Sequence, residues 1–269
     1  MTKVLGGTCA LLFSLHAWPA AFDCLIEPTQ AIDVGSPVVG LLDKVHVRRG
    51  DRVSRGQVLA SLESRAEQAA AELARFKSQA SGPTMTAENK IEFSSRKFQR
   101  RAQMALEKLM SSQERDDAEV EFKLAEAELQ VAKENRQLAQ IEYQQQSSLL
   151  NLRTLRSPFD GVVVDQLLYP GEVVEPTGNK KTILKLAQLD PLRVHVILPM
   201  AAFRKITAGM SARVAPEMPV GGAHPAKVKI VDKLIDAASG TFAAFLEMRN
   251  PELAIPAGVK CKAEFAIAL

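Results

Sequence analysis

The sequence lacks long hydrophobic runs, an excess of charge of one sign, and most aromatic side chains. No stretch reaches about 18 clean apolar residues, which excludes a polytopic membrane protein. Among 269 residues, 34 Lys and Arg oppose 31 Asp and Glu, and this even balance argues against a nucleic-acid partner. The hydrophobic fraction of 46% beside 24% charged residues is nevertheless that of a folded chain rather than a disordered one.

Motifs for catalysis and metal binding are missing as well. The sequence has no G-x-S-x-G, no H-E-x-x-H and no P-loop, and its four His residues are scattered. The three Cys residues form no C-x-x-C pair and no cluster with His, which argues against a zinc site. The sequence therefore predicts a protein that is not an enzyme, with no catalytic residue, cofactor or metal.

Residues 1–21 resemble a signal for secretion. Lys3 gives a basic start, residues 4–15 are mostly apolar, and the small residues Ala20 and Ala21 suit a signal peptidase. Because the segment is short and interrupted by Pro19, we expect cleavage; a retained membrane anchor is the alternative.

Export would also affect whether the cysteines form a disulfide. Cys9 leaves with the signal, and Cys24 and Cys261 remain in the exported chain. An oxidising compartment predicts a disulfide between these two, although two separate buried thiols also fit the sequence.

Two segments of the chain share one pattern of turns and strands. Residues 36–40 read Ser-Pro-Val-Val-Gly and residues 157–161 read Ser-Pro-Phe-Asp-Gly, and a second glycine follows each final glycine after ten residues. Each repeat alone has too few apolar positions for a core, so we expect the two to pack into one β module. The repeat predicts turn positions that resist a Cβ at Gly40, Gly50, Gly161 and Gly171.

Residues 64–150, between the repeats, have the period of α-helices. Capping boxes of the form S-x-x-E stand at residues 64–67 and 111–114, and Pro83 interrupts the first helical run. The pattern predicts an antiparallel helical hairpin with its tip near residue 111. Its outgoing arm is the longer one, and we expect residues 81–84 to bulge or loop to absorb the difference.

The returning arm carries apolar residues at alternating spacings of 4 and 3, as in a coiled coil. We expect this seam to pack against the outgoing arm of the same chain, and a dimerising coiled coil is the alternative. The predicted seam consists of Val120, Leu124, Ala127, Val131, Glu134, Leu138, Ile141 and Gln145.

Residues 188–269 return to strand-like alternation, as at Val194, Val196 and Leu198, and predict a small β-barrel. The fold class is therefore α+β, multidomain and elongated. In chain order we expect an N-terminal strand joining the barrel (22–35), the first half of the β module (36–63), the hairpin (64–150), the second half (151–187) and the barrel (188–269).

This order of half module, hairpin, half module and barrel resembles the periplasmic adaptors, or membrane fusion proteins, of the HlyD-like and RND-type efflux family. The strongest similarity covers residues 40–59, with Gly-Asp-Arg-Val-Ser-Arg-Gly-Gln-Val-Leu at 50–59, together with residues 157–163. In that family the two β segments are halves of a split lipoyl-like domain.

The resemblance implies a protein that links an inner-membrane transporter, of RND or ABC type, to an outer-membrane channel. It also implies a homo-oligomeric ring and a location in the Gram-negative periplasm, associated with the inner membrane. A periplasmic coiled-coil structural protein without a transport role is the alternative. A carrier subunit of an enzyme is a third possibility, but helices occupy the joint between the halves, where such carriers display a modified Lys.

The resemblance also assigns a contact with the outer-membrane duct to Arg100, Met104 and Ser111, followed by Asp116 and Ala118 at the family's usual spacing. Met104 replaces the family's usual Leu. From the residues alone, Ser111 is equally well placed as a helix N-cap.

Overall fold

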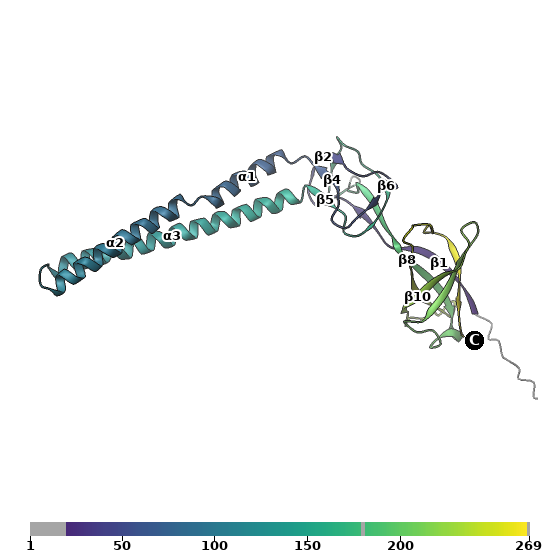
Figure 1. Cartoon of the computed structure of the whole chain (residues 1–269). Coiled ribbons are helices and arrows are strands. Elements are labelled where there is room, and N and C mark those ends of the chain that lie inside the picture. Colours follow the sequence, from purple (N-terminus) through teal and green to yellow (C-terminus); the bar gives the residue numbers. More distant parts are fainter. Residues whose placement is uncertain (1–19, 179–180, 268–269) are drawn as a thin grey trace, which may run out of the picture.

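The computed structural model describes residues 20–178 and 181–267. It is elongated, with a β-barrel at one end, a β module in the middle and a long helical hairpin at the other end (Figure 1). The expected α+β fold is therefore confirmed. The predicted signal lies outside the described residues, apart from its last two. Within the two described ranges, no helix is long and apolar enough to cross a membrane.

Six strands close the barrel. Their order is β1 (Ala20–Val34), β12 (Lys260–Phe265), β9 (Ser211–Pro216), β10 (His224–Val231), β11 (Thr241–Met248) and β8 (Leu184–Pro199), and β8 pairs again with β1. Alternate residues point inward, so that Phe242, Ala244, Leu246 and Met248 of β11 are buried. Closure leaves the barrel with no exposed strand edge along these pairings.

Strands β1 and β8 are long because each contributes side chains to two hydrophobic cores, that of the barrel and that of the middle module. Ile26 in the first half of β1 packs in the barrel core, whereas Val34 at its end packs in the core of the middle module. Likewise, Leu184 and Leu186 of β8 belong to the module, and Val196 of the same strand belongs to the barrel. The two parts are therefore joined by continuous, paired strands (Figure 1).

The middle module combines both repeats. Strands β6 (Gly161–Gln166) and β3 (Arg52–Val53) extend the sheet that contains β8, and a second sheet holds β5 (Thr154–Arg156), β4 (Val58–Leu62), β2 (Gly40–Val45) and β7 (Val173–Val174). Leu42 and Leu59 from the first repeat share one core with Val163 and Val174 from the second. The two repeats pack on each other, as expected from their small number of apolar positions.

The four glycines of the repeat fall into two kinds. Gly50 and Gly171 have φ of +93° and +94° and occupy left-handed turns, as predicted. The prediction of turns at Gly40 and Gly161 is wrong, because these residues begin strands β2 and β6. Gly161 resists a Cβ for another reason, namely the close approach of a backbone atom, whereas the nearest atom at Gly40 is the end of a side chain. A Cβ would lie 2.5 Å from Nη1 of Arg153 at Gly40 and 2.6 Å from the carbonyl oxygen of Ala187 at Gly161.

The hairpin consists of α1 (Arg65–Gln79) and α2 (Gly82–Leu106) packed along α3 (Ser112–Asn151). The 40 residues of α3 span about 60 Å at 1.5 Å per residue. The break in the outgoing arm is confined to Ala80 and Ser81, so the loop predicted over residues 81–84 is wrong. Pro83 stands in the first turn of α2, where its missing N–H has no intrahelical acceptor to lose.

Candidate functional site: the hairpin and its tip

Small side chains fill the contact between the two arms of the hairpin. Among the described residues, the buried positions of the helices are Ala71, Ala74, Ser78, Thr84, Ala87, Ser94, Ala118 and Ala125. Two larger side chains, Phe98 and Phe122, stack across the arms with ring centroids 6.1 Å apart. Small residues allow the helices to approach closely but bury little apolar area.

The seam predicted for the returning arm is wrong. Val120, Leu124, Val131, Leu138 and Ile141 are each more than half exposed and do not form the contact with the outgoing arm. We call these five residues the outer stripe. Helix α3 contains a second heptad series two residues earlier, which includes the buried Ala118 and Ala125. Periodicity gives the spacing of a seam, but it does not tell which of two parallel series faces the neighbouring helix.

Ion pairs fix the register of the two arms. Three lysines of the outgoing arm each meet a glutamate of α3, at 3.3 Å for Lys77 with Glu142, 2.6 Å for Lys90 with Glu128 and 2.5 Å for Lys97 with Glu121. The pairs follow one antiparallel alignment on both sides of the break at residues 80–81. Each is at least partly exposed and contributes about 0.2–1 kcal/mol, so their role is to select the register rather than to provide most of the stability.

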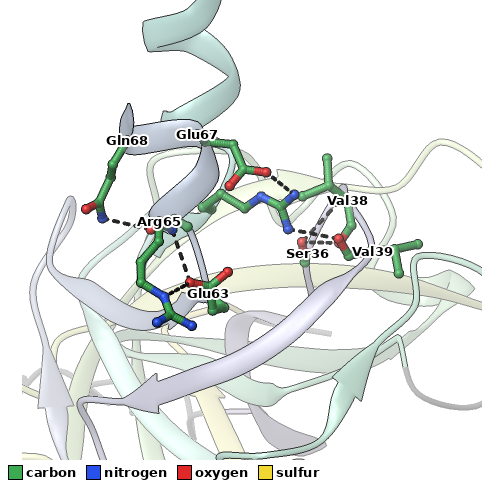
Figure 2. Close-up of polar contacts among 9 residues, drawn as sticks. Ser36, Val38, Val39, Glu63, Arg65, Glu67 and Gln68 are labelled. Carbon is green, nitrogen blue, oxygen red and sulfur yellow. Dashed lines mark hydrogen bonds and ion pairs between the residues drawn. The ribbon is translucent and has the colours of Figure 1, made fainter. Parts of the chain in front are cut away.

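The base of the hairpin is tied to the β module by Arg153, which follows α3. Its guanidinium pairs with Glu67 of α1 and donates 2.9 Å to the carbonyl oxygen of Val39. Helix α1 begins after Ser64 as predicted, but the capping box at residues 64–67 does not form, because Ser64 makes no side-chain capping bond and the Glu67 carboxylate is paired with Arg153. Figure 2 shows the Glu63–Arg65 pair and Gln68 at the same joint. Nε2 of Gln68 donates a hydrogen bond of 2.9 Å to Oγ of Ser64. The hydrogen bond from Arg65 holds the pKa of Glu63 below its usual value.

The tip of the hairpin is closed by the second predicted capping box, which is confirmed. Oγ of Ser111 accepts a hydrogen bond from the backbone N–H of Glu114 at 3.3 Å, and the Glu114 carboxylate accepts one from the backbone N–H of Ser111 at 3.3 Å. Arg101 adds a link between the arms by donating 3.2 Å to the carbonyl oxygen of Glu114. Sequence reasoning missed this contact of Arg101, which is adjacent to the residue that the family resemblance selected.

The residues assigned to duct contact lie near this tip. Arg100 and Met104 stand in the last two turns of α2, Ser111 precedes α3, and all three are exposed. Leu106 and Leu109, which sequence reasoning also missed, are strongly exposed beside them. The tip thus offers a guanidinium and several apolar side chains to a partner. The contact itself stays a prediction.

The cysteines lie far from the hairpin, in the barrel. Cys24 of β1 stands opposite Cys261 of β12, with Cα atoms 4.9 Å apart, and their sulfurs are joined in a disulfide of 2.07 Å. This bond ties the first strand of the described chain to the last.

A hairpin inserted between two halves of a β module, followed by a closed barrel, defines a barrel-sandwich protein of the adaptor type. Residues 30–187 match the family model described as CzcB-like, barrel-sandwich hybrid domain. The match covers more than half of the chain, and the chain belongs to this family. The resemblance to periplasmic adaptors noted from the sequence is therefore confirmed.

Curated relatives include the macrolide export protein MacA of Yersinia pestis, 23% identical over 188 residues, which are 70% of this chain and 51% of the relative. The cobalt-zinc-cadmium resistance protein CzcB of Cupriavidus metallidurans is 23% identical over 220 residues, or 81% of this chain and 39% of that protein. The chain thus spans about half or less of the length of these relatives. The crystal structure of MacA from Actinobacillus actinomycetemcomitans shares the fold, with a TM-score of 0.74 and 22% identity over 92% of this chain and 78% of that one.

Proposed function

We propose that the chain is a periplasmic adaptor of a tripartite efflux or secretion system and that it links an inner-membrane transporter, of RND or ABC type, to an outer-membrane channel. Its relatives are membrane fusion adaptors of efflux systems, a class without enzymatic activity, and we extend that property to this chain. The observation that carries the proposal is the separation of the two ends of the molecule. The barrel and the hairpin tip lie at opposite extremes, on either side of the β module (Figure 1).

The hairpin is built to hold its tip at a distance. Helix α3 runs without interruption for about 60 Å, and the lysine–glutamate pairs hold the outgoing arm in one register along it. At the far end, Arg100 offers several fixed donors to carbonyl or carboxylate oxygens of a partner. Met104 offers an adaptable apolar side chain beside it.

The outer stripe supports assembly of several copies into a ring. It places five apolar side chains on one face of α3 at the spacings of a coiled coil, in a chain whose own arms pack through a different series. On the outgoing arm Phe76 and Phe93 are also exposed. We propose that hairpins of neighbouring copies cover these surfaces, side by side, in the periplasm.

The test changes the tip without removing its fold. Ser111→Asp keeps a side chain that caps α3 and adds charge, and Arg100→Glu reverses the charge of an exposed residue. We expect both variants to keep the melting temperature within about 2 °C, because surface changes of this kind cost little. We expect both to abolish export and crosslinking to the outer-membrane channel.

The matched control is Arg136→Glu, an exposed arginine of α3 well away from the tip. Normal export by both tip variants would contradict the adaptor role of the tip. That result would favour the alternative function, a structural coiled-coil protein without a transport role.

A further inference from the structure

The hairpin is attached to the β module at a narrow joint. The chain leaves the module between Leu62, the end of β4, and Arg65, the start of α1, and it returns between Asn151 of α3 and Thr154 of β5. Beyond these two crossings, the helices pack mainly on one another. Because α3 is about 60 Å long, a rotation of about 10° at the joint would move the tip by about 10 Å. The contacts at the joint therefore decide where the tip lies.

Arg153 belongs to both sides of this joint. Its backbone N–H donates 3.0 Å to the carbonyl oxygen of Leu150 in the last turn of α3, and its carbonyl oxygen accepts 2.8 Å from the N–H of Leu62 in β4. Its side chain donates from Nη1 to the carbonyl oxygen of Val39 at 2.9 Å and pairs through Nη2 with the carboxylate of Glu67. One residue thus connects the end of α3, the start of α1 and two segments of the module.

The ion pair of Arg153 is partly shielded from water. The side chains of Arg153 and Glu67 are 21% and 24% exposed, whereas Arg65, which pairs with Glu63 at the same joint, is 91% exposed. Partly buried pairs are screened less by salt and solvent than exposed ones. The planar guanidinium also serves two acceptors in fixed directions, which the single ammonium of a lysine does not. This contact is therefore suited to restrain an angle.

The acceptor on the module is held in place on both sides. Before Val39, the hydroxyl of the buried Ser36 donates 2.6 Å to the carbonyl oxygen of Val38 and accepts 3.1 Å from the N–H of Val38 (Figure 2). After Val39, Gly40 begins β2 and pairs with Val174 of β7. The Val39 carbonyl is therefore a fixed point to which the guanidinium is fastened.

Gly40 leaves the space that the guanidinium occupies. A Cβ at this position would lie 2.5 Å from Nη1 of Arg153, and the next nearest atom is Cδ1 of Leu62 at 3.1 Å. The obstacle is the end of a long side chain rather than backbone. A methyl group at Gly40 would therefore displace the guanidinium while the strands of the module stay paired.

From these contacts we propose that Arg153 is the positioning residue of the hairpin. Its guanidinium, seated over Gly40 between Glu67 and the Val39 carbonyl, fixes the direction in which the hairpin leaves the β module. The importance of this direction for export rests on the proposed function. The direction itself is a property of the folded chain and is measured without reference to export.

Distances between two spin labels test the direction. Lys133 of α3 and Lys185 of β8 are exposed, the first on the hairpin and the second beside core residues of the module. In a Cys9→Ser background Cys24 and Cys261 stay joined, so Lys133→Cys and Lys185→Cys supply the only free thiols. Double electron–electron resonance on the labelled chain should give one narrow distance distribution.

Two substitutions disrupt the contact from opposite sides. Arg153→Gln removes the guanidinium, and Gly40→Ala keeps it but fills its space. Each should make the distance distribution about twice as wide, because the hairpin is a long lever, while circular dichroism shows unchanged helix and strand content. Since both variants act on one contact, the double variant should be no wider than either single one. Additive broadening would mean that Gly40 does not act through Arg153.

The matched control is Arg65→Gln, which removes the other arginine of the same joint. Arg65 pairs with Glu63, two residues earlier in the chain, so this pair does not span the joint between distant segments. The control should keep the narrow distribution. The proposal is overturned if Arg153→Gln and Gly40→Ala are as narrow as this control, or if the unchanged chain is already as broad as the variants.

Export measured in cells separates this proposal from the proposed function. Arg153→Gln should lower export about tenfold, since the tip would meet its partner in only a fraction of the orientations. Normal export by Arg153→Gln, despite a broad distribution and loss of export in the tip variants, would overturn the positioning role. Normal export by the tip variants would instead overturn the proposed function, and the measured distances would still decide whether Arg153 sets the direction.

Discussion

The barrel and the hairpin bury opposite kinds of side chain. In the barrel, large residues such as Leu198, Leu246 and Phe265 are inside, and less buried residues alternate with them on the outside. In the hairpin, the contact between the arms holds mainly Ala, Ser and Thr beside the Phe98–Phe122 pair, and most of the other large apolar residues of α3 are exposed. The barrel therefore buries its large apolar side chains within the chain, whereas the hairpin leaves much of its apolar surface exposed.

The disulfide gives the largest expected difference between the two regions. Cys24→Ser should lower the free energy of unfolding of the barrel by up to about 5 kcal/mol, because the bond closes a ring across 237 residues of sequence. Denaturant unfolding followed by strand signals measures this loss, and helical signals should change less. Two titratable thiols in denatured, unreduced protein taken from cells would show that the bond is absent there.

Truncation of a core residue in the barrel comes next. Leu246→Ala should cost about 2–5 kcal/mol, since the side chain is 1% exposed and its removal leaves a cavity. Ile197→Ala, on the outer face of the neighbouring strand, serves as the control and should stay within about 0.5 kcal/mol. Equal losses for the two variants in thermal unfolding would mean that the barrel has no distinct interior.

Enlargement of a seam residue in the hairpin should have a smaller effect. Ala125→Leu should cost about 1–3 kcal/mol, because the position is fully buried between the arms and extra methylenes force them apart. Ala127→Leu places the same side chain at an exposed position of the same helix and should cost almost nothing. Circular dichroism during thermal unfolding compares them. The seam assigned to Ala118 and Ala125 is disproved if Ala127→Leu is the more damaging change.

The smallest effect on folding is expected in the outer stripe, together with a large effect on assembly. Leu124→Ala should change the free energy of unfolding by less than about 0.5 kcal/mol, since Leu124 is mostly exposed. Sedimentation velocity at high protein concentration should show weaker self-association than in the unchanged chain. If Leu124→Ala leaves self-association unchanged, the outer stripe no longer supports assembly into a ring.

The predictions that succeeded depended mostly on residues at fixed, short spacings in the sequence. The fixed distance between paired glycines and the poor core of each repeat were enough to place the two halves of the β module together. The capping box at Ser111 and Glu114 was predicted because all of its groups lie within four residues.

The errors arose where a contact between distant segments decided the outcome. Glu67 was predicted to cap α1, but Arg153, 86 residues later, takes its carboxylate. Gly161 was expected in a turn, but what excludes a side chain there is the carbonyl oxygen of Ala187 on a neighbouring strand. The apolar heptad of α3 gave no sign of which face meets the outgoing arm, since both series have the required spacing.

The pairing of β1 has a consequence for the order in which the chain acquires its structure. Its partners are β8, which begins at Leu184, and β12, which begins at Lys260, whereas the helices of the hairpin meet segments much closer in sequence. Contacts between distant segments form slowly, because a long loop must close first. Under the proposed export across a membrane, β1 would emerge early and remain unpaired at both of its edges until nearly all of the chain had followed. The hairpin forms while β1 is still unpaired, so the barrel is the last part of the molecule to be completed and the part most in need of protection by a chaperone.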